Sequence, residues 1–93
     1  MESAPQSDTT LLKRLAAVLE GEEPQGPQRA LILRLARDIA HAGERQDAPL
    51  STFMVGRYVQ MRAAHGVSEA AALAEAAALV AGLVPAFESR DAT

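Results

Sequence analysis

Hydrophobic residues recur along this chain at spacings of three and four, which is the pattern of amphipathic helices. Four stretches show it, and they are separated by polar turns or by segments rich in glycine and proline. Because the connections are short, neighbouring helices should pack antiparallel. The pattern therefore predicts an all-α fold, a small antiparallel four-helix bundle. The predicted helices span residues 9–20, 28–43, 49–65 and 68–84.

Residues with special backbone or capping chemistry mark the predicted helix ends. Asp8 or Thr9 can cap the first helix, since a short side-chain oxygen accepts the free N–H groups of an opening turn. Gly21 can end that helix, because glycine readily adopts left-handed backbone. We expect Ser68 to cap the fourth helix and Pro85 to kink or end it.

The second and third predicted helices carry broad apolar faces. A helix with so little polar surface is typical of a central position, packed by neighbours on most sides. These faces, together with apolar positions of the outer helices, predict the core. The expected core residues are Leu15, Leu31, Leu35, Ile39, Leu50, Phe53, Met54, Leu73, Ala77 and Val80.

Arg57 interrupts the apolar stripe of the third predicted helix. Burying an unpaired charge costs free energy, so a guanidinium on an inward face needs a compensating partner. Three roles fit this position: pairing with a buried acid, lining an interface with a partner, or joining an anion site.

The length of 93 residues corresponds to one small domain. We expect a disordered N-terminus over 1–8, a single helical domain over 9–87 and a flexible tail over 88–93. A chain of this size has a thin core, and a homodimer would bury additional apolar surface.

The composition excludes several kinds of chemistry. The chain has no cysteine, so it holds no disulfide, thiolate zinc site or cysteine nucleophile. Its six glycines are isolated and form no phosphate-binding loop. Asp38 and His41 could offer two ligands to a metal, but a site needs more, and His65 lies at a helix end. We therefore predict a protein that is not an enzyme, with no catalytic residue, metal or cofactor.

Charge is unevenly distributed along the chain. Residues 1–27 carry five acids against two bases, residues 28–66 carry six arginines against three acids, and residues 67–93 carry four acids against one arginine. The pI of about 5.3 and the three aromatic residues argue against a nucleic-acid partner. No stretch is long and apolar enough for a membrane span, and the acidic N-terminus is unlike a signal peptide, so we expect a cytoplasmic protein.

A polar stripe follows one side of the second predicted helix. Arg34, Arg37, His41 and Arg45 lie within about 80° of one another on a helical wheel, so they could hold a phosphate or carboxylate. The stripe could equally be a solvated face with local pairs such as Arg34–Asp38.

Residues 35–56, LARDIAHAGERQDAPLSTFMVG, resemble a poorly characterised family of small helical bacterial domains without an established activity. The shared pattern is LAR-x-x-AH-x-x-x-R-x-x-APL-[ST]-x-F-x-x-G. Members of that family occur as stand-alone chains of about this length, or appended to enzymes that attach a nucleotide to the molybdenum cofactor. The positions that fill the pattern here are Leu35, Ala36, Arg37, Ala40, His41, Arg45, Ala48, Pro49, Leu50, Ser51, Phe53 and Gly56.

The resemblance implies a role near molybdenum-cofactor maturation, for instance for an enzyme of the formate-dehydrogenase type, and implies no chemistry of its own. It ends after Gly56, so nothing transfers from it to Arg57. We therefore expect a non-catalytic accessory or protein-interaction module, whose partner is another protein or a second copy of itself. The alternative is a small anion- or nucleotide-binding domain that uses the stripe of Arg34, Arg37, His41 and Arg45.

Overall fold

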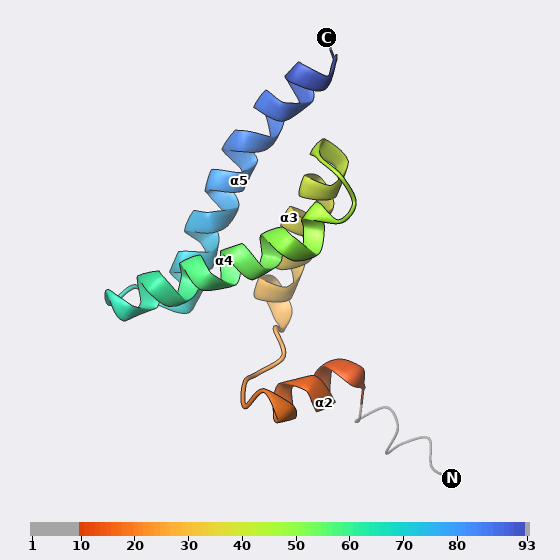
Figure 1. Cartoon of the computed structure of the whole chain (residues 1–93). Helices are drawn as coiled ribbons and strands as arrows, with labels where there is room; N and C mark the ends of the chain where they lie inside the picture. The colour runs from red at the N-terminus through yellow and green to blue at the C-terminus, as the bar shows by residue number, and fades with distance from the viewer. Residues whose placement is uncertain (1–9, 93) are drawn as a thin grey trace.

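The computed structural model describes the backbone of residues 10–92 and the side chains of residues 10–85. This part of the chain contains helices and no strand, which confirms the predicted all-α, four-helix class (Figure 1). Residues 1–8 and the predicted caps Asp8 and Thr9 lie outside it. The helices are α2 (Leu11–Val18), α3 (Gly26–Ala42), α4 (Asp47–Ala64) and α5 (Glu69–Ala92).

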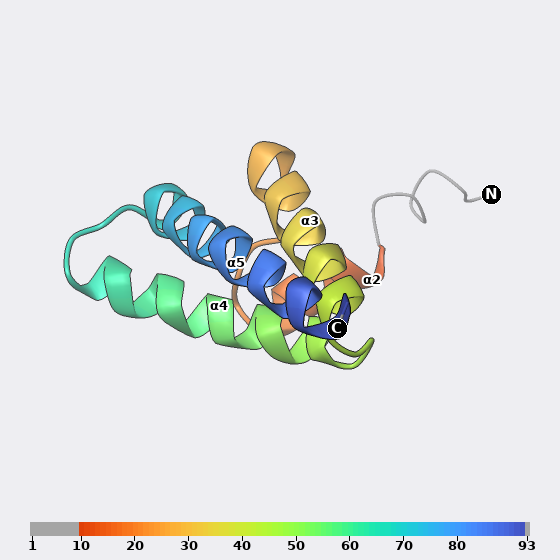
Figure 2. The ribbon, with the colours of Figure 1, turned by 90° about the horizontal axis from the view of Figure 1, so that it is seen from above.

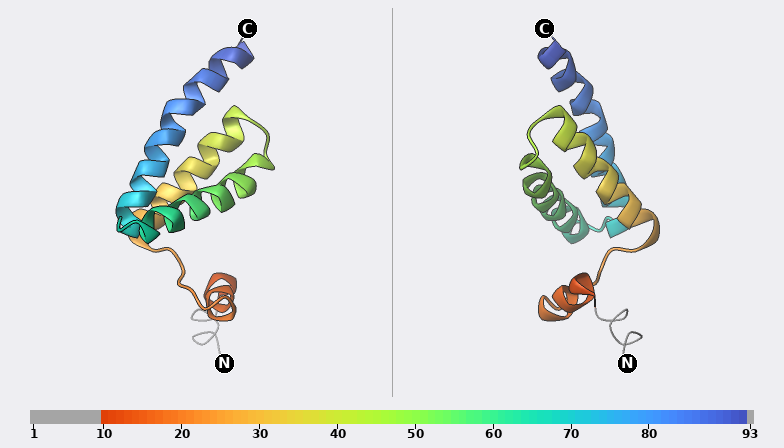
Figure 3. Two further views of the ribbon diagram at one scale, coloured as in Figure 1. Left: turned by 60° about the vertical axis from the view of Figure 1, so that its left-hand side comes forward. Right: turned by 90° about the vertical axis from the view of Figure 1, so that its right-hand side faces the viewer.

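Helices α3, α4 and α5 pack on one another, and each runs opposite to the one before it (Figures 1 and 2). Helix α2 lies apart from them, beyond an extended linker at residues 19–25 (Figure 3). The radius of gyration is 15.8 Å, whereas a compact domain of this length has about 12 Å. The molecule is therefore a three-helix body with a helical arm.

Helix α2 begins and ends slightly differently from the prediction. Thr10 caps it, since its hydroxyl accepts a hydrogen bond from the backbone N–H of Lys13 at 3.3 Å. At the other end Glu20, and not Gly21, adopts the left-handed conformation, with φ of 57°. The N–H of Gly21 donates to the carbonyl of Ala16 at 2.9 Å. In this type of helix stop the left-handed residue directly precedes the residue whose N–H donates that bond. Here the donor is Gly21, so the left-handed residue is Glu20.

The turn between α3 and α4 depends on Gly43 and Asp47. The Asp47 carboxylate accepts the backbone N–H of Glu44 at 2.8 Å, which starts α4 two residues earlier than predicted. A Cβ atom on Gly43 would lie 2.5 Å from Asp47 Oδ2. A larger residue at position 43 would therefore displace the carboxylate that accepts the Glu44 N–H.

The connection from α4 to α5 follows the predicted chemistry. Gly66 has φ of 92°, and the N–H of Val67 donates to the carbonyl of Arg62 at 3.1 Å, as in a glycine helix stop. The Ser68 hydroxyl accepts the N–H of Ala71 at 3.1 Å, which confirms the predicted cap.

Helix α5 corrects the predicted end at residue 84, because it continues through Pro85 to Ala92. A proline removes one backbone hydrogen bond, while the flanking helical residues keep theirs, so it does not have to end a helix. The helix includes residues 88–92 of the predicted tail.

The buried core is small and rich in alanine. Leu35 and Leu73 are 3% and 6% exposed, as predicted, while Leu31, Ile39 and Val80 are half-buried. Ala77 is also half-buried. The fully buried alanines were not predicted as core and are Ala42, Ala72 and Ala76.

The other predicted core residues are wrong: Leu15, Leu50, Phe53 and Met54 are exposed. Helix α4 turns its opposite side toward α3 and α5. On that side Thr52, Val55 and Val59 line a cleft of about 230 Å³ together with Leu35 and Leu73. These smaller side chains allow a closer approach of the helices.

Gly66 and Gly82 form a matched pair for testing the helix stop. Neither has an atom within 4 Å of a built Cβ, but only Gly66 has left-handed backbone. We expect Gly66→Ala to lower the free energy of unfolding by about 1 kcal/mol, and Gly82→Ala, inside a helix, to raise it by about 0.5–1 kcal/mol. Urea denaturation followed by circular dichroism measures both. Equal effects of the two substitutions would contradict the assignment.

Candidate functional site

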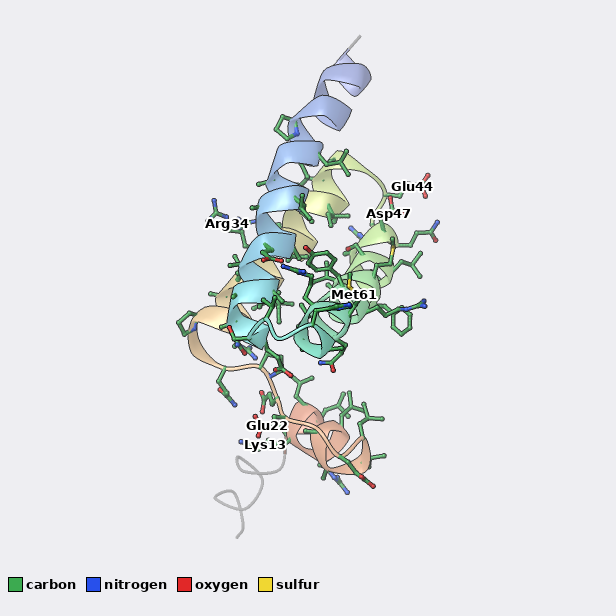
Figure 4. All side chains as sticks on the ribbon, turned by 90° about the vertical axis from the view of Figure 1, so that its left-hand side faces the viewer. Lys13, Glu22, Arg34, Glu44, Asp47 and Met61 are labelled. Atoms are coloured by element: carbon green, nitrogen blue, oxygen red, sulfur yellow. The ribbon has the colours of Figure 1, made fainter. Side chains whose placement is uncertain are left out.

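One side of α4 presents large apolar side chains to solvent. The exposed fractions are 62% for Leu50, 66% for Phe53, 67% for Met54 and 48% for Met61. The steps between them along the chain are three, one and seven residues, which places them along one side of a helix. Met61, labelled in Figure 4, lies in the last turn of α4. We call these four residues together with Arg57 the α4 apolar face.

Arg57 lies within this face and is exposed. Its guanidinium carbon is 5.6 Å from the centroid of the Phe53 ring, a cation–π geometry. Of the three roles left open for Arg57, pairing with a buried acid does not fit, because Arg57 is exposed. Because the stripe faces outward, its charge is not buried.

A groove extends the α4 apolar face toward the other helices. Its lining includes Leu50 and Met54 of α4, Ile39 of α3, and Leu83 and Val84 of α5. The groove has a volume of about 350 Å³. Side chains from three helices thus form a continuous apolar surface.

Helix α2 has a second exposed apolar face. Leu11, Val18 and Leu19 are 79%, 77% and 68% exposed, and Leu15 on the same side is 46% exposed. None of its residues is buried. The arm therefore carries an amphipathic helix whose apolar side has no partner within the described chain.

The arginine and histidine stripe is divided by the structure. Arg34, Arg37 and His41 are exposed on α3. Arg45 follows the end of α3 in the turn, so a helical wheel does not place it with the other three. The expected Arg34–Asp38 pair is replaced by Arg37–Asp38, at 3.8 Å.

Arg34 of α3 lies on the opposite side of the view in Figure 4 from Glu44 and Asp47, which belong to the turn after α3 and the start of α4. The predicted four-residue cradle for an anion is thus reduced to three exposed side chains on one helix.

Three polar side chains join α4 to α5. The Tyr58 hydroxyl donates to Glu75 Oε1 at 3.0 Å. The Arg62 guanidinium donates to both carboxylate oxygens of Glu75, at 2.9 and 3.2 Å. Two-point contact of this kind fixes orientation as well as distance. The three residues hold the Tyr58 side of α4 against α5.

The same contacts change the ionisation of the group. The hydrogen bonds from Arg62 and then Tyr58 lower the pKa of Glu75 below its ordinary value of 4.5. The hydrogen bond to Glu75 raises the pKa of Tyr58 above 10.0. The stabilisation from ionised Glu75 is therefore present above pH 4.5 and is lost as the pH falls through its lower folded-state pKa.

This polar cluster was missed at the level of sequence. The sequence feature that could have revealed the cluster is Glu75, the only charged residue between Glu69 and Glu88 in an alanine-rich stretch. A lone carboxylate at such a position calls for a partner on a neighbouring helix.

Among the described side chains, no three histidine, cysteine, aspartate or glutamate residues come together as a metal site would need. Over the described residues, no helix combines the length and apolar character of a bilayer span.

The comparisons with known proteins assign the family. A family of domains of unknown function, DUF6457, matches residues 4–92. The chain belongs to this family. Neither the curated proteins nor the solved structures give a match to it. Membership in DUF6457 confirms the expectation of a family of small domains without an assigned function.

Tyr58 is the only tyrosine of this DUF6457 domain, and the chain has no tryptophan, so its ionisation can be followed by ultraviolet absorbance. We expect a titration midpoint above 10.0 in the native protein. Glu75→Gln should lower this midpoint toward 10.0, because it removes the charged acceptor. The control is Glu69→Gln, an exposed acid outside the cluster. Identical midpoints in the native protein and Glu75→Gln would contradict the cluster.

Proposed function

We propose that this DUF6457 domain is a non-catalytic protein-interaction module that docks through the α4 apolar face. The observation that supports this is the outward orientation of Leu50, Phe53, Met54 and Met61. Soluble monomers rarely expose contiguous apolar patches larger than a few hundred Å². Here four large apolar side chains, 48% to 67% exposed, lie along one side of α4 beside an apolar groove.

The residue types of the face are those of protein interfaces. Aromatic residues, methionine and arginine are enriched there relative to the rest of protein surfaces. Phe53 under Arg57 supplies a rigid apolar anchor with a cation above it. Met54 and Met61 add flexible side chains that adapt to a partner's shape.

We further propose that the partner is an enzyme that attaches a nucleotide to the molybdenum cofactor, acting in the cytoplasm. The support is the resemblance of residues 35–56, whose pattern includes Leu50 and Phe53 of the α4 apolar face. On this proposal the domain supplies binding and the partner supplies the chemistry.

The anion-binding alternative has weaker support. Arg34, Arg37 and His41 are exposed on one side of α3, which favours it. Arg37, however, already has Asp38 as a neighbour at 3.8 Å, and Arg45 lies beyond the helix. A charged side chain that is exposed and paired locally gains little from binding a further ion.

If the domain docks through the α4 apolar face, a charge placed on that face should weaken partner binding. Phe53→Asp puts a charge at the centre of the α4 apolar face, and we expect it to weaken binding of a molybdenum-cofactor nucleotidyltransferase by about 100-fold. Leu33→Asp is the matched control, because Leu33 is 57% exposed on α3. Co-purification with the tagged domain, followed by calorimetry with the purified enzyme, measures both.

Two results would refute this proposal. One is the absence of any heat of binding between the unaltered domain and the enzyme. The other is an equal loss of binding in Phe53→Asp and Leu33→Asp, which would place the contact outside the α4 apolar face.

A further inference from the structure

The arm and the body of this domain each have an uncovered apolar helix face. On α2 the face is formed by Leu11, Leu15, Val18 and Leu19. On α4 it is the α4 apolar face already described. Within the described residues nothing buries either face, and both occur on the same chain.

Two ion pairs of Glu23 link α2 to the start of α3. Glu23 lies 3.9 Å from Lys13 of α2 and 3.7 Å from Arg29 of α3, and its side chain is 15% exposed. Figure 4 shows Lys13 beside the linker. Glu23 therefore connects the arm to the start of the body.

The position of Lys13 determines which side of α2 is free. Lys13 and Leu15 are two residues apart, so they point about 160° from each other around the helix. Contact of Lys13 with Glu23 directs the polar side of α2 toward its own linker. The apolar side then faces outward, where a second molecule can reach it.

We propose that α2 of one copy packs against the α4 apolar face of a second copy, with the reciprocal contact completing a two-fold arm-exchanged dimer. This inference rests on the proposed function of the α4 apolar face. It states that α2 of a second copy covers this face when no other protein is bound. The module's first partner is a second copy of this chain, and another protein must displace the arm in order to dock.

The two faces are similar in length. The apolar side of α2 is about 12 Å long and that of α4 about 17 Å, at 1.5 Å of rise per residue. A stable protein interface buries about 1,200–2,000 Å² in total. Exchange of both arms forms two helix contacts, and a single docked arm forms one.

The charges also match. Residues 1–27 are net acidic and residues 28–66 are net basic. Glu20 and Glu22 follow directly after α2, while Arg57 lies in the middle of the α4 apolar face, and all three are exposed. Opposite charges at the rim of an apolar contact favour the correct orientation of the two copies.

Sedimentation equilibrium of the full chain tests the exchange. We expect a dimer at micromolar concentration. Leu15→Asp in the arm and Phe53→Asp in the body should each raise the dissociation constant by about 100-fold or more. Leu79→Asp is the control on α5, where Leu79 is 63% exposed outside both faces, and it should remain dimeric.

Mixing the two defective chains separates arm exchange from other dimers. The Phe53→Asp chain keeps an intact arm and the Leu15→Asp chain keeps an intact α4, so one contact remains. We expect a heterodimer that is tighter than either variant alone and weaker than the unaltered dimer. Circular dichroism confirms that each variant keeps its helices.

Three outcomes overturn the inference: an unaltered chain that is monomeric, a Leu15→Asp chain that dimerises normally, or a mixture that stays monomeric. A monomer points to an arm that packs on its own α4 or to a different occupant. Failure of the proposed function is a separate result, because it shows as unchanged enzyme binding in Phe53→Asp whatever the oligomeric state.

Discussion

The burial of small side chains where α3 and α5 pack together is the constraint on which the rest of the structure depends. Ala72 is completely buried, and Ala42 and Ala76 are nearly so. An alanine side chain permits a short distance between helix axes but removes little apolar surface from water. The packed interior is consequently small for a chain with this apolar content, and large side chains remain on the outside.

The cluster of Tyr58, Arg62 and Glu75 forms only in the observed rotation of α4. If α4 turned its other side inward, Leu50 and Phe53 would be buried, but Glu75 would lose both partners across the helix contact. The Arg62 and Glu75 side chains are 34% and 39% exposed, so water would replace part of what is lost. In the observed rotation the α4 apolar face is a surface open to other molecules.

The sequence predicted the helices well and their orientation poorly. Spacing of apolar residues located four helices, and Gly66 and Ser68 marked a connection that the structure reproduces. The same spacing placed Phe53 in the core, because an apolar stripe normally faces inward. Periodicity shows that a stripe exists but not which partner covers it.

The candidate site was predicted only in part for the same reason. Arg57 was identified as unusual within an apolar stripe, and it belongs to the α4 apolar face. Glu75 was overlooked, since its two partners come from another helix and no local pattern joins them. The grouping of Arg45 with the α3 stripe failed because Arg45 lies in the turn after α3, beyond both the observed helix end at Ala42 and the predicted end at residue 43, where a helical wheel no longer applies.

The central claim is that small side chains at the helix contact set the packing of the whole body. Ala72→Leu tests it most directly, with Ala78→Leu as the control, since Ala78 lies on the same helix and is exposed. Guanidinium denaturation should show Ala72→Leu less stable by about 1–3 kcal/mol, the usual cost of overpacking a close contact, and Ala78→Leu nearly unchanged. A stability of Ala72→Leu equal to or above that of the unaltered protein would show that the helices do not need their close approach.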